Sequence, residues 1–165
     1  MEKTLKILIA GAECAPLSKT GGLADVVAAL PRALNARGLD VRVITPYHRC
    51  IKETYAAQTE HICHIYVDLG WRRQYAGLEK LALPGLTVYL VDSEFYFGDS
   101  IYRGGDAEVE QYAFFQRAVA ELLPYLPDFA PELLHCNDWH TAMLPFLLKT
   151  QYSGRPHGLA DRPGI

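Results

Sequence analysis

The sequence predicts an α/β fold: a Rossmann-like parallel sheet with helices on both faces and an antiparallel hairpin insertion. Over the first 45 residues, short apolar runs alternate with a helical pattern, an order typical of parallel strands joined by crossover helices. Three extended segments then follow one another with only turn residues between them, which indicates the antiparallel insertion.

The first unit is a strand, a helix and a second strand. Leu5 to Ala10 and Val41 to Thr45 are short runs rich in β-forming residues. Between them, Leu23 to Arg37 has apolar residues at spacings of three and four, which makes one apolar stripe on a helix. Gly38 follows as a natural helix stop, so the chain is expected to start as a βαβ unit.

The middle of the chain predicts the insertion. Extended segments are expected near 61–69, 72–82 and 86–91, and Pro84-Gly85 joins the last two. Their close succession favours a meander or hairpin, because antiparallel strands need only short turns between them.

The last third predicts two helices and a strand. A long helix is expected from about Ala107 to Leu126, with Asp106 as its cap. Leu133 to Cys136 is a short buried strand, and a helix follows from about Trp139 to Lys149. Together these elements predict one domain over residues 1–152.

Composition and charge exclude several classes of protein. The 165 residues carry a formal net charge of -3 and no basic stripe, so no nucleic-acid partner is expected. The longest apolar stretches are far shorter than the roughly 20 residues that cross a bilayer, and no signal peptide is expected before the first strand. We therefore expect a cytoplasmic protein with no membrane partner. Residues 153–165 have no periodic apolar face and are expected to form a disordered or non-native tail.

Cysteines and histidines predict neither a disulfide framework nor a metal site. The four cysteines include no CxxC pair, so reduced thiols are expected. His61, Cys63 and His64 lie close together in sequence. Alternation along a strand would put residues 61 and 63 on one face and residue 64 on the other, so no metal is expected there.

The loop from Gly11 to Asp25 is the most informative stretch, because it leaves the first strand and opens the first helix. Its paired glycines, Gly21 and Gly22, let a ligand approach the backbone, and the helix start offers unpaired N–H groups to a diphosphate. Lys19 adds a flexible positive charge. The alternative is a solvated lysine in a glycine turn, and the residues alone leave both interpretations open.

A second candidate site, Asn137-Asp138-Trp139-His140, follows the last strand. Loops at the carboxyl ends of parallel strands share one edge of a sheet, where ligands bind, so Lys19 and Asp138 should face one cleft. Asp138 can hydrogen-bond sugar hydroxyls, and His140 can do the same or hold Asp138 in place. The alternative is that Asp138 only caps the next helix.

Other residues near these loops are weaker candidates. Asp25 lies in the first turn of its helix, where the helix dipole stabilises a carboxylate without any ligand. Glu13 lies in the loop itself. Tyr47 and His48 follow the second strand and either line the cleft or belong to its rim.

With these residues, the chain resembles bacterial glycogen synthases and plant starch synthases, the ADP-glucose-dependent glucan synthase family. The motif that carries the resemblance is Lys19-Thr-Gly-Gly-Leu-Ala-Asp-Val-Val, followed by Ala29-Leu-Pro-Arg-Ala-Leu. Glu13, Val43-Ile-Thr-Pro-Tyr47 and His135-Cys-Asn-Asp-Trp-His140 accompany it in the family's order.

The resemblance implies the N-terminal half of a GT-B glycosyltransferase. Such an enzyme transfers glucose, with retention, from ADP-glucose to the non-reducing end of an α-1,4-glucan such as glycogen, and needs no metal or other cofactor. The residues implied to bind ADP-glucose are Lys19, Gly21, Gly22 and Glu13. Those implied to be catalytic, near the glucosyl group and the acceptor, are Asp25, Asp138 and His140.

The chain departs from the family after the D-W-H helix. A strand ending in T-[VI]-H-N is expected there, but Arg155 to Ile165 replaces it, and His157 is no convincing substitute. The resemblance also implies a second GT-B domain, which we expect to be missing. We therefore expect an incomplete fragment that is inactive alone and binds ADP-glucose weakly or not at all. The alternatives are a non-catalytic α/β nucleotide-sugar-binding or interaction module and an unrelated nucleotide-binding domain.

Overall fold

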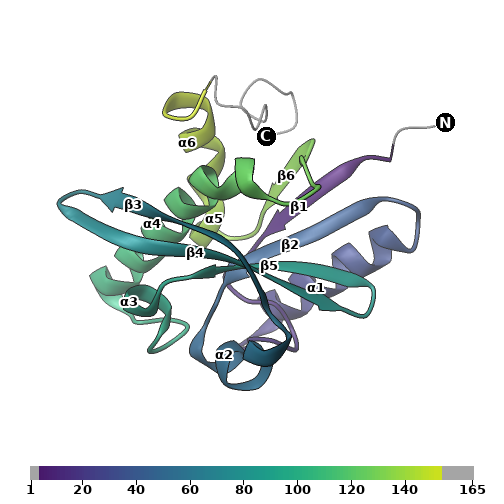
Figure 1. Ribbon diagram of the computed structural model, residues 1–165, viewed down its shortest axis with the longest axis horizontal. Coiled ribbons are helices and arrows are strands. Elements are labelled where there is room, and N and C mark those ends of the chain that lie inside the picture. The colour runs from purple at the N-terminus through teal and green to yellow at the C-terminus, as the bar shows by residue number, and fades with distance from the viewer. Residues whose placement is uncertain (1–3, 154–165) are drawn as a thin grey trace.

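In the part of the chain that the structure describes, six strands form one mixed sheet in the order β3-β4-β5-β2-β1-β6 (Figure 1). The computed structural model describes residues 4–153. Neighbouring strands are parallel from β5 through β2 and β1 to β6, and antiparallel from β3 through β4 to β5. The strands are β1 Lys6–Ala10, β2 Asp40–Pro46, β3 Glu60–Leu69, β4 Arg72–Leu83, β5 Leu86–Asp92 and β6 Leu133–Cys136.

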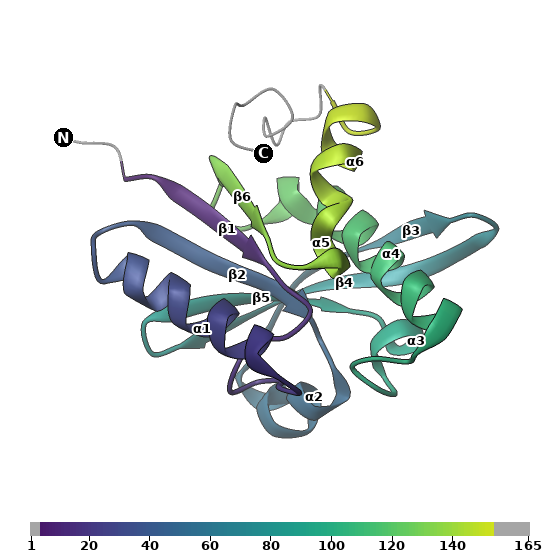
Figure 2. The same cartoon turned by 180° about the vertical axis from the view of Figure 1, so that it is seen from behind.

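Helices cover both faces of the parallel part of the sheet. Because side chains alternate along a strand, Ile7 and Ile9 pack in the core under α1, whereas Leu8 and Ala10 pack in the core under α4. Figure 2 shows α1 on one side of the sheet and α4 to α6 on the other. The longer helices are α1 Gly22–Asn35, α2 Arg49–Tyr55, α4 Gly105–Leu122 and α6 Leu144–Thr150; the shorter ones are α3 Glu94–Phe97 and α5 Trp139–Ala142, with 3₁₀ turns η1 Ala56–Gln58 and η2 Leu123–Tyr125.

The insertion differs from the prediction in one strand. β5 pairs antiparallel with β4 but also parallel with β2, so it belongs to the parallel sheet as well as to the meander. The inserted part is therefore the β3–β4 hairpin, which extends the sheet at one end.

The predicted limits of the later helices are partly wrong. Asp106 does not cap α4: the helix begins at Gly105, and its N-cap is Gly104, whose φ of 78° favours glycine. The Gly104 N–H donates to Glu108 Oε2 at 2.8 Å instead. The helix expected from Trp139 onward is divided at Met143 into α5 and α6.

A β-bulge overturns the predicted alternation at the histidines of β3. The register shifts between His61 and Cys63, which pair with the consecutive residues Glu79 and Leu78. The extra residue between them places the side chains of His61 and Cys63 on opposite faces of the sheet. His61 and His64 now share a face, with ring centroids 6.0 Å apart, while Cys63 packs against the core. Within residues 4–153 no group of three potential ligands is placed to hold a metal. The tail from residue 154 onward, with His157, lies outside the described residues.

Candidate functional site

The candidate site lies where the strand order reverses. β2 and then β5 continue the sheet on one side of β1, whereas β6 pairs with its other side. In an open parallel sheet the carboxyl ends of strands at such a reversal form a natural ligand crevice. The loops that leave β1 and β6 carry both sets of sequence-predicted residues, so the fold brings these two loops to one place.

Glu13 organises the loop after β1. Its carboxylate is buried and accepts hydrogen bonds from the Thr20 backbone N–H, from the Thr20 hydroxyl at 2.9 Å and from the Tyr102 hydroxyl at 2.5 Å. Burial and the hydrogen bond to Glu13 raise the pKa of Tyr102. These contacts fix the loop from inside, which makes Glu13 a positioning residue in this structure.

Lys19 and Asp25 contact each other directly. Lys19 Nζ lies 2.7 Å and 2.8 Å from the two carboxylate oxygens of Asp25, and the two side chains are 50% and 55% exposed. Half-exposed ion pairs contribute only about 0–1 kcal/mol to stability. An anionic ligand can therefore take the place of Asp25 beside Lys19 at little cost.

The glycines of this loop have different reasons to be glycine. A Cβ on Gly11 would lie 2.7 Å from Val27 Cγ2, so packing of α1 against β1 requires glycine there. At Gly21 and Gly22 a Cβ would meet nothing within 4 Å, and the φ of Gly21, -157°, is open to any residue. The described fold therefore does not require glycine at positions 21 and 22. The open space beside their backbone leaves room for a ligand.

Asp138 does act as a helix cap. Its Oδ1 accepts a hydrogen bond from the Trp139 N–H at 2.6 Å. However, its backbone angles, φ 63° and ψ 179°, lie in a region that only glycine normally adopts and that costs about 1–3 kcal/mol in other residues. Asp138 therefore caps the helix, as the alternative interpretation of the sequence predicted. Capping alone does not require this backbone conformation and does not explain it.

His140 is a buried neighbour of Tyr102 and is not hydrogen-bonded to Asp138. Its ring centroid lies 5.2 Å from that of Tyr102 and 4.6 Å from that of Tyr112. Burial lowers the pKa of His140, and its buried Nδ1 has no hydrogen-bond partner among the described residues. The ring is therefore neutral near pH 7, with one nitrogen free to accept or donate.

Sequence reasoning missed Tyr102, which connects the two loops. It comes from the segment between α3 and α4, donates to Glu13 and packs against His140. Tyr47 and His48 are buried rather than on a rim, and His48 Nε2 lies 2.9 Å from the Ala12 carbonyl oxygen. The structure thus joins Glu13 to His140 through Tyr102, and Lys19 to Asp25. A cleft shared by Lys19 and Asp138 stays a prediction.

Similarity to known proteins now decides the family. Residues 6–159 match the model of the starch synthase catalytic domain. The chain belongs to this family. Two glycogen synthases of Streptococcus pneumoniae, from strains 70585 and CGSP14, are each 47% identical over 148 residues, which is 90% of this chain and 31% of theirs. These matches confirm the predicted glycogen and starch synthase family.

A solved structure gives the same result. The catalytic domain of Starch Synthase IV from Arabidopsis thaliana, bound to ADP and acarbose, is 26% identical, with a TM-score of 0.77. The match covers 96% of this chain and 32% of that one, which confirms the α/β fold of a GT-B glycosyltransferase. This chain of the starch synthase family spans about a third of the length of these relatives. No helix within residues 4–153 is long and apolar enough to cross a membrane.

Proposed function

We propose that this chain provides part of the active site of a glucosyltransferase that transfers glucose from ADP-glucose to the non-reducing end of an α-1,4-glucan such as glycogen. The observation that carries the proposal is the exchangeable Lys19–Asp25 ion pair beside the open backbone of Gly21 and Gly22, in a chain of the starch synthase family. The Arabidopsis relative is bound to ADP and acarbose, which supports nucleotide and carbohydrate ligands.

Each residue has a role that its surroundings support. Lys19 would exchange Asp25 for the diphosphate of the donor, and the N–H groups at the start of α1 would add their partial positive charge. Both would stabilise the departing ADP while the glucosyl group becomes oxocarbenium-like. Asp25, released from Lys19, and Asp138 would face the glucosyl and acceptor hydroxyls. Neutral His140 would hydrogen-bond one of these hydroxyls.

The described residues supply only one side of such a site. In a GT-B enzyme a second domain closes over the nucleotide sugar, so we expect this chain alone to bind the donor weakly and to transfer no glucose. The alternative function, a non-catalytic nucleotide-sugar-binding module, predicts the same weak binding. It differs in predicting no transfer even when the remaining part of a synthase is supplied.

Donor binding by the chain is best followed by NMR, because weak binding still moves amide signals. ADP-glucose at millimolar concentration should shift the amide signals of residues 19–25, and ADP alone should shift most of the same signals. Lys19→Ala should weaken this binding about tenfold, since charge-assisted contacts are the strong ones. Arg37→Ala, an exposed change beyond the far end of α1, is the matched control. If the amide signals of Lys19→Ala shift at the same ADP-glucose concentrations as those of the unaltered chain, the assignment of this site is contradicted.

A further inference from the structure

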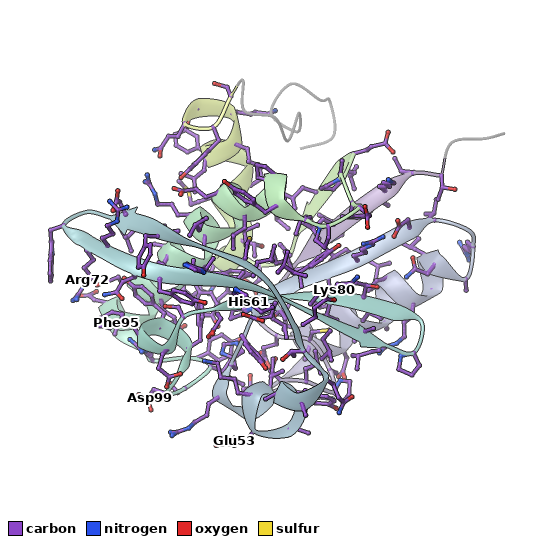
Figure 3. All side chains as sticks on the ribbon, viewed as in Figure 1. Glu53, His61, Arg72, Lys80, Phe95 and Asp99 are labelled. Atoms are coloured by element: carbon purple, nitrogen blue, oxygen red, sulfur yellow. The ribbon has the colours of Figure 1, made fainter. Side chains whose placement is uncertain are left out.

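Exposed aromatic rings and arginines gather next to the loop that carries Tyr102. Trp71, in the turn between β3 and β4, is 84% exposed, and Phe95 in α3 is 42% exposed. The Arg72 guanidinium lies 4.3 Å from the Trp71 ring centroid and 5.0 Å from that of Phe95, and Arg103 lies 5.9 Å from Phe95. We call Trp71, Arg72, Phe95 and Arg103 the aromatic platform. Figure 3 shows Arg72 and Phe95 together on the side of the molecule where the β3–β4 hairpin ends.

The aromatic platform is held in place by contacts beneath it. Arg72 Nε forms an ion pair with Glu110 Oε1 on α4 at 2.7 Å, and the Tyr96 hydroxyl donates to the same oxygen at 2.9 Å. Arg103 donates a hydrogen bond to the Phe95 carbonyl oxygen. Three segments distant in sequence are thus tied together, and the resulting surface is ordered while the indole remains open to solvent.

Charge and shape favour a neutral polyhydroxylated ligand. Glu110 neutralises Arg72, so the aromatic platform lacks the unpaired arginine pair that phosphate groups select. Aromatic faces carry negative charge and stack on the weakly positive C–H face of a sugar ring. The guanidinium N–H groups beside the rings can donate to hydroxyls. The two exposed rings, each beside an arginine, therefore offer apolar faces and hydrogen-bond donors to the same ligand.

We propose that the aromatic platform binds an α-1,4-glucan chain and holds it beside the candidate site. The identity of the glucan rests on the proposed function. The position rests on the fold: Arg103 follows Tyr102 directly, and the Tyr102 hydroxyl reaches Glu13 at 2.5 Å. The aromatic platform and the network that organises the site therefore meet at two adjacent residues, Arg103 and Tyr102.

Affinity electrophoresis of the full chain tests the proposal. Amylopectin in a native gel should retard the chain, and Trp71→Ala should weaken the apparent affinity about tenfold, as loss of an exposed aromatic anchor does. Trp71→Phe should recover most of the retardation because it keeps an aromatic face. Tyr125→Ala is the control, since Tyr125 is also an exposed aromatic residue, 52% exposed, but lies in η2. A circular dichroism spectrum checks that each variant is folded.

Three results would overturn the proposal: no retardation of the unaltered chain, equal retardation of Trp71→Ala, or equal retardation by a β-1,4-linked glucan. A solution mass that falls in Trp71→Ala while retardation persists would also overturn it and assign the surface to a second copy of the chain. The NMR titration with ADP-glucose separates the two proposals. Donor shifts without glucan retardation refute only the aromatic platform, and retardation without donor shifts refutes only the donor site.

Discussion

Two histidines beside the candidate site are buried in their neutral form. Burial lowers the pKa of His48 to about 4, despite its contact with the Ala12 carbonyl oxygen, and it also lowers the pKa of His140. An unfolded chain binds protons at these rings below the ordinary pKa of 6.5, whereas the folded chain does not. Folding therefore becomes less favourable as the pH falls through this range.

We expect the free energy of unfolding to decrease between pH 6.5 and pH 4. For His48 the decrease should approach about 1.4 kcal/mol per pH unit in the middle of this window, between its ordinary and its lowered pKa, and its contribution to stability is fully present above pH 6.5. His140 should add a decrease of the same sign. His48→Gln keeps a side-chain donor but removes one titrating group, so its stability should depend less steeply on pH. Urea denaturation at several pH values measures this. An unchanged slope in His48→Gln would contradict the assignment of a neutral buried ring.

The sequence located most of the candidate residues but not their partners. Lys19, Asp25, Asp138 and His140 could be found because they stand in short motifs next to predicted strand ends. Tyr102 could not, because it lies 89 residues from Glu13 along the chain and only the packed fold brings the two together. The position of Asp138 in a glycine-like conformation also depends on backbone geometry that no residue pattern reveals.

The loop and helix after β1 show how one element serves both folding and binding. Gly11 lets α1 approach β1, whereas Gly21 and Gly22 face open space at the start of the helix. The same segment thus contains one glycine that the core requires and two that the core does not. Mutations at these glycines can therefore test stability and ligand binding separately.

Gly11→Ala should destabilise the chain by about 1–3 kcal/mol, because the added methyl group overpacks against Val27. Gly22→Ala, inside the first turn of α1, should change the free energy of unfolding by no more than about 0.5 kcal/mol, yet weaken donor binding because the methyl group occupies the space beside the diphosphate. Denaturation and the NMR titration measure the two effects on the same samples. Equal destabilisation by both changes, or undiminished donor binding in Gly22→Ala, would contradict this division of roles.

The strands were easier to predict than their pairing. Apolar runs and turn residues indicated all six strands, with ends close to those observed. The parallel partner of β5 and the bulge in β3 were not foreseeable, because pairing depends on contacts between distant segments and a bulge adds a residue without changing the pattern of residue types. The short helices α2 and α3 are too brief to show helical periodicity.

In the molecule as a whole, the candidate site lies at one edge of the sheet. The reversal of strand order places the loops after β1 and β6 together, and the segment before α4 joins them through Tyr102. Arg103 of the aromatic platform lies on the same segment. Because the relatives are about three times as long as this chain, its activity is best tested within one of them.

The most direct measurement is glucose transfer by a hybrid enzyme. Residues 6–150 would replace the matching segment of the 47% identical Streptococcus pneumoniae glycogen synthase, and transfer of labelled glucose from ADP-glucose to glycogen would be followed. We predict an active hybrid whose kcat/KM falls about 100-fold in Lys19→Ala, the size of loss typical when a charge-stabilising group is removed, and stays within about twofold in Arg37→Ala. A folded hybrid that transfers no glucose, or one that is unaffected by Lys19→Ala, would contradict the proposed function.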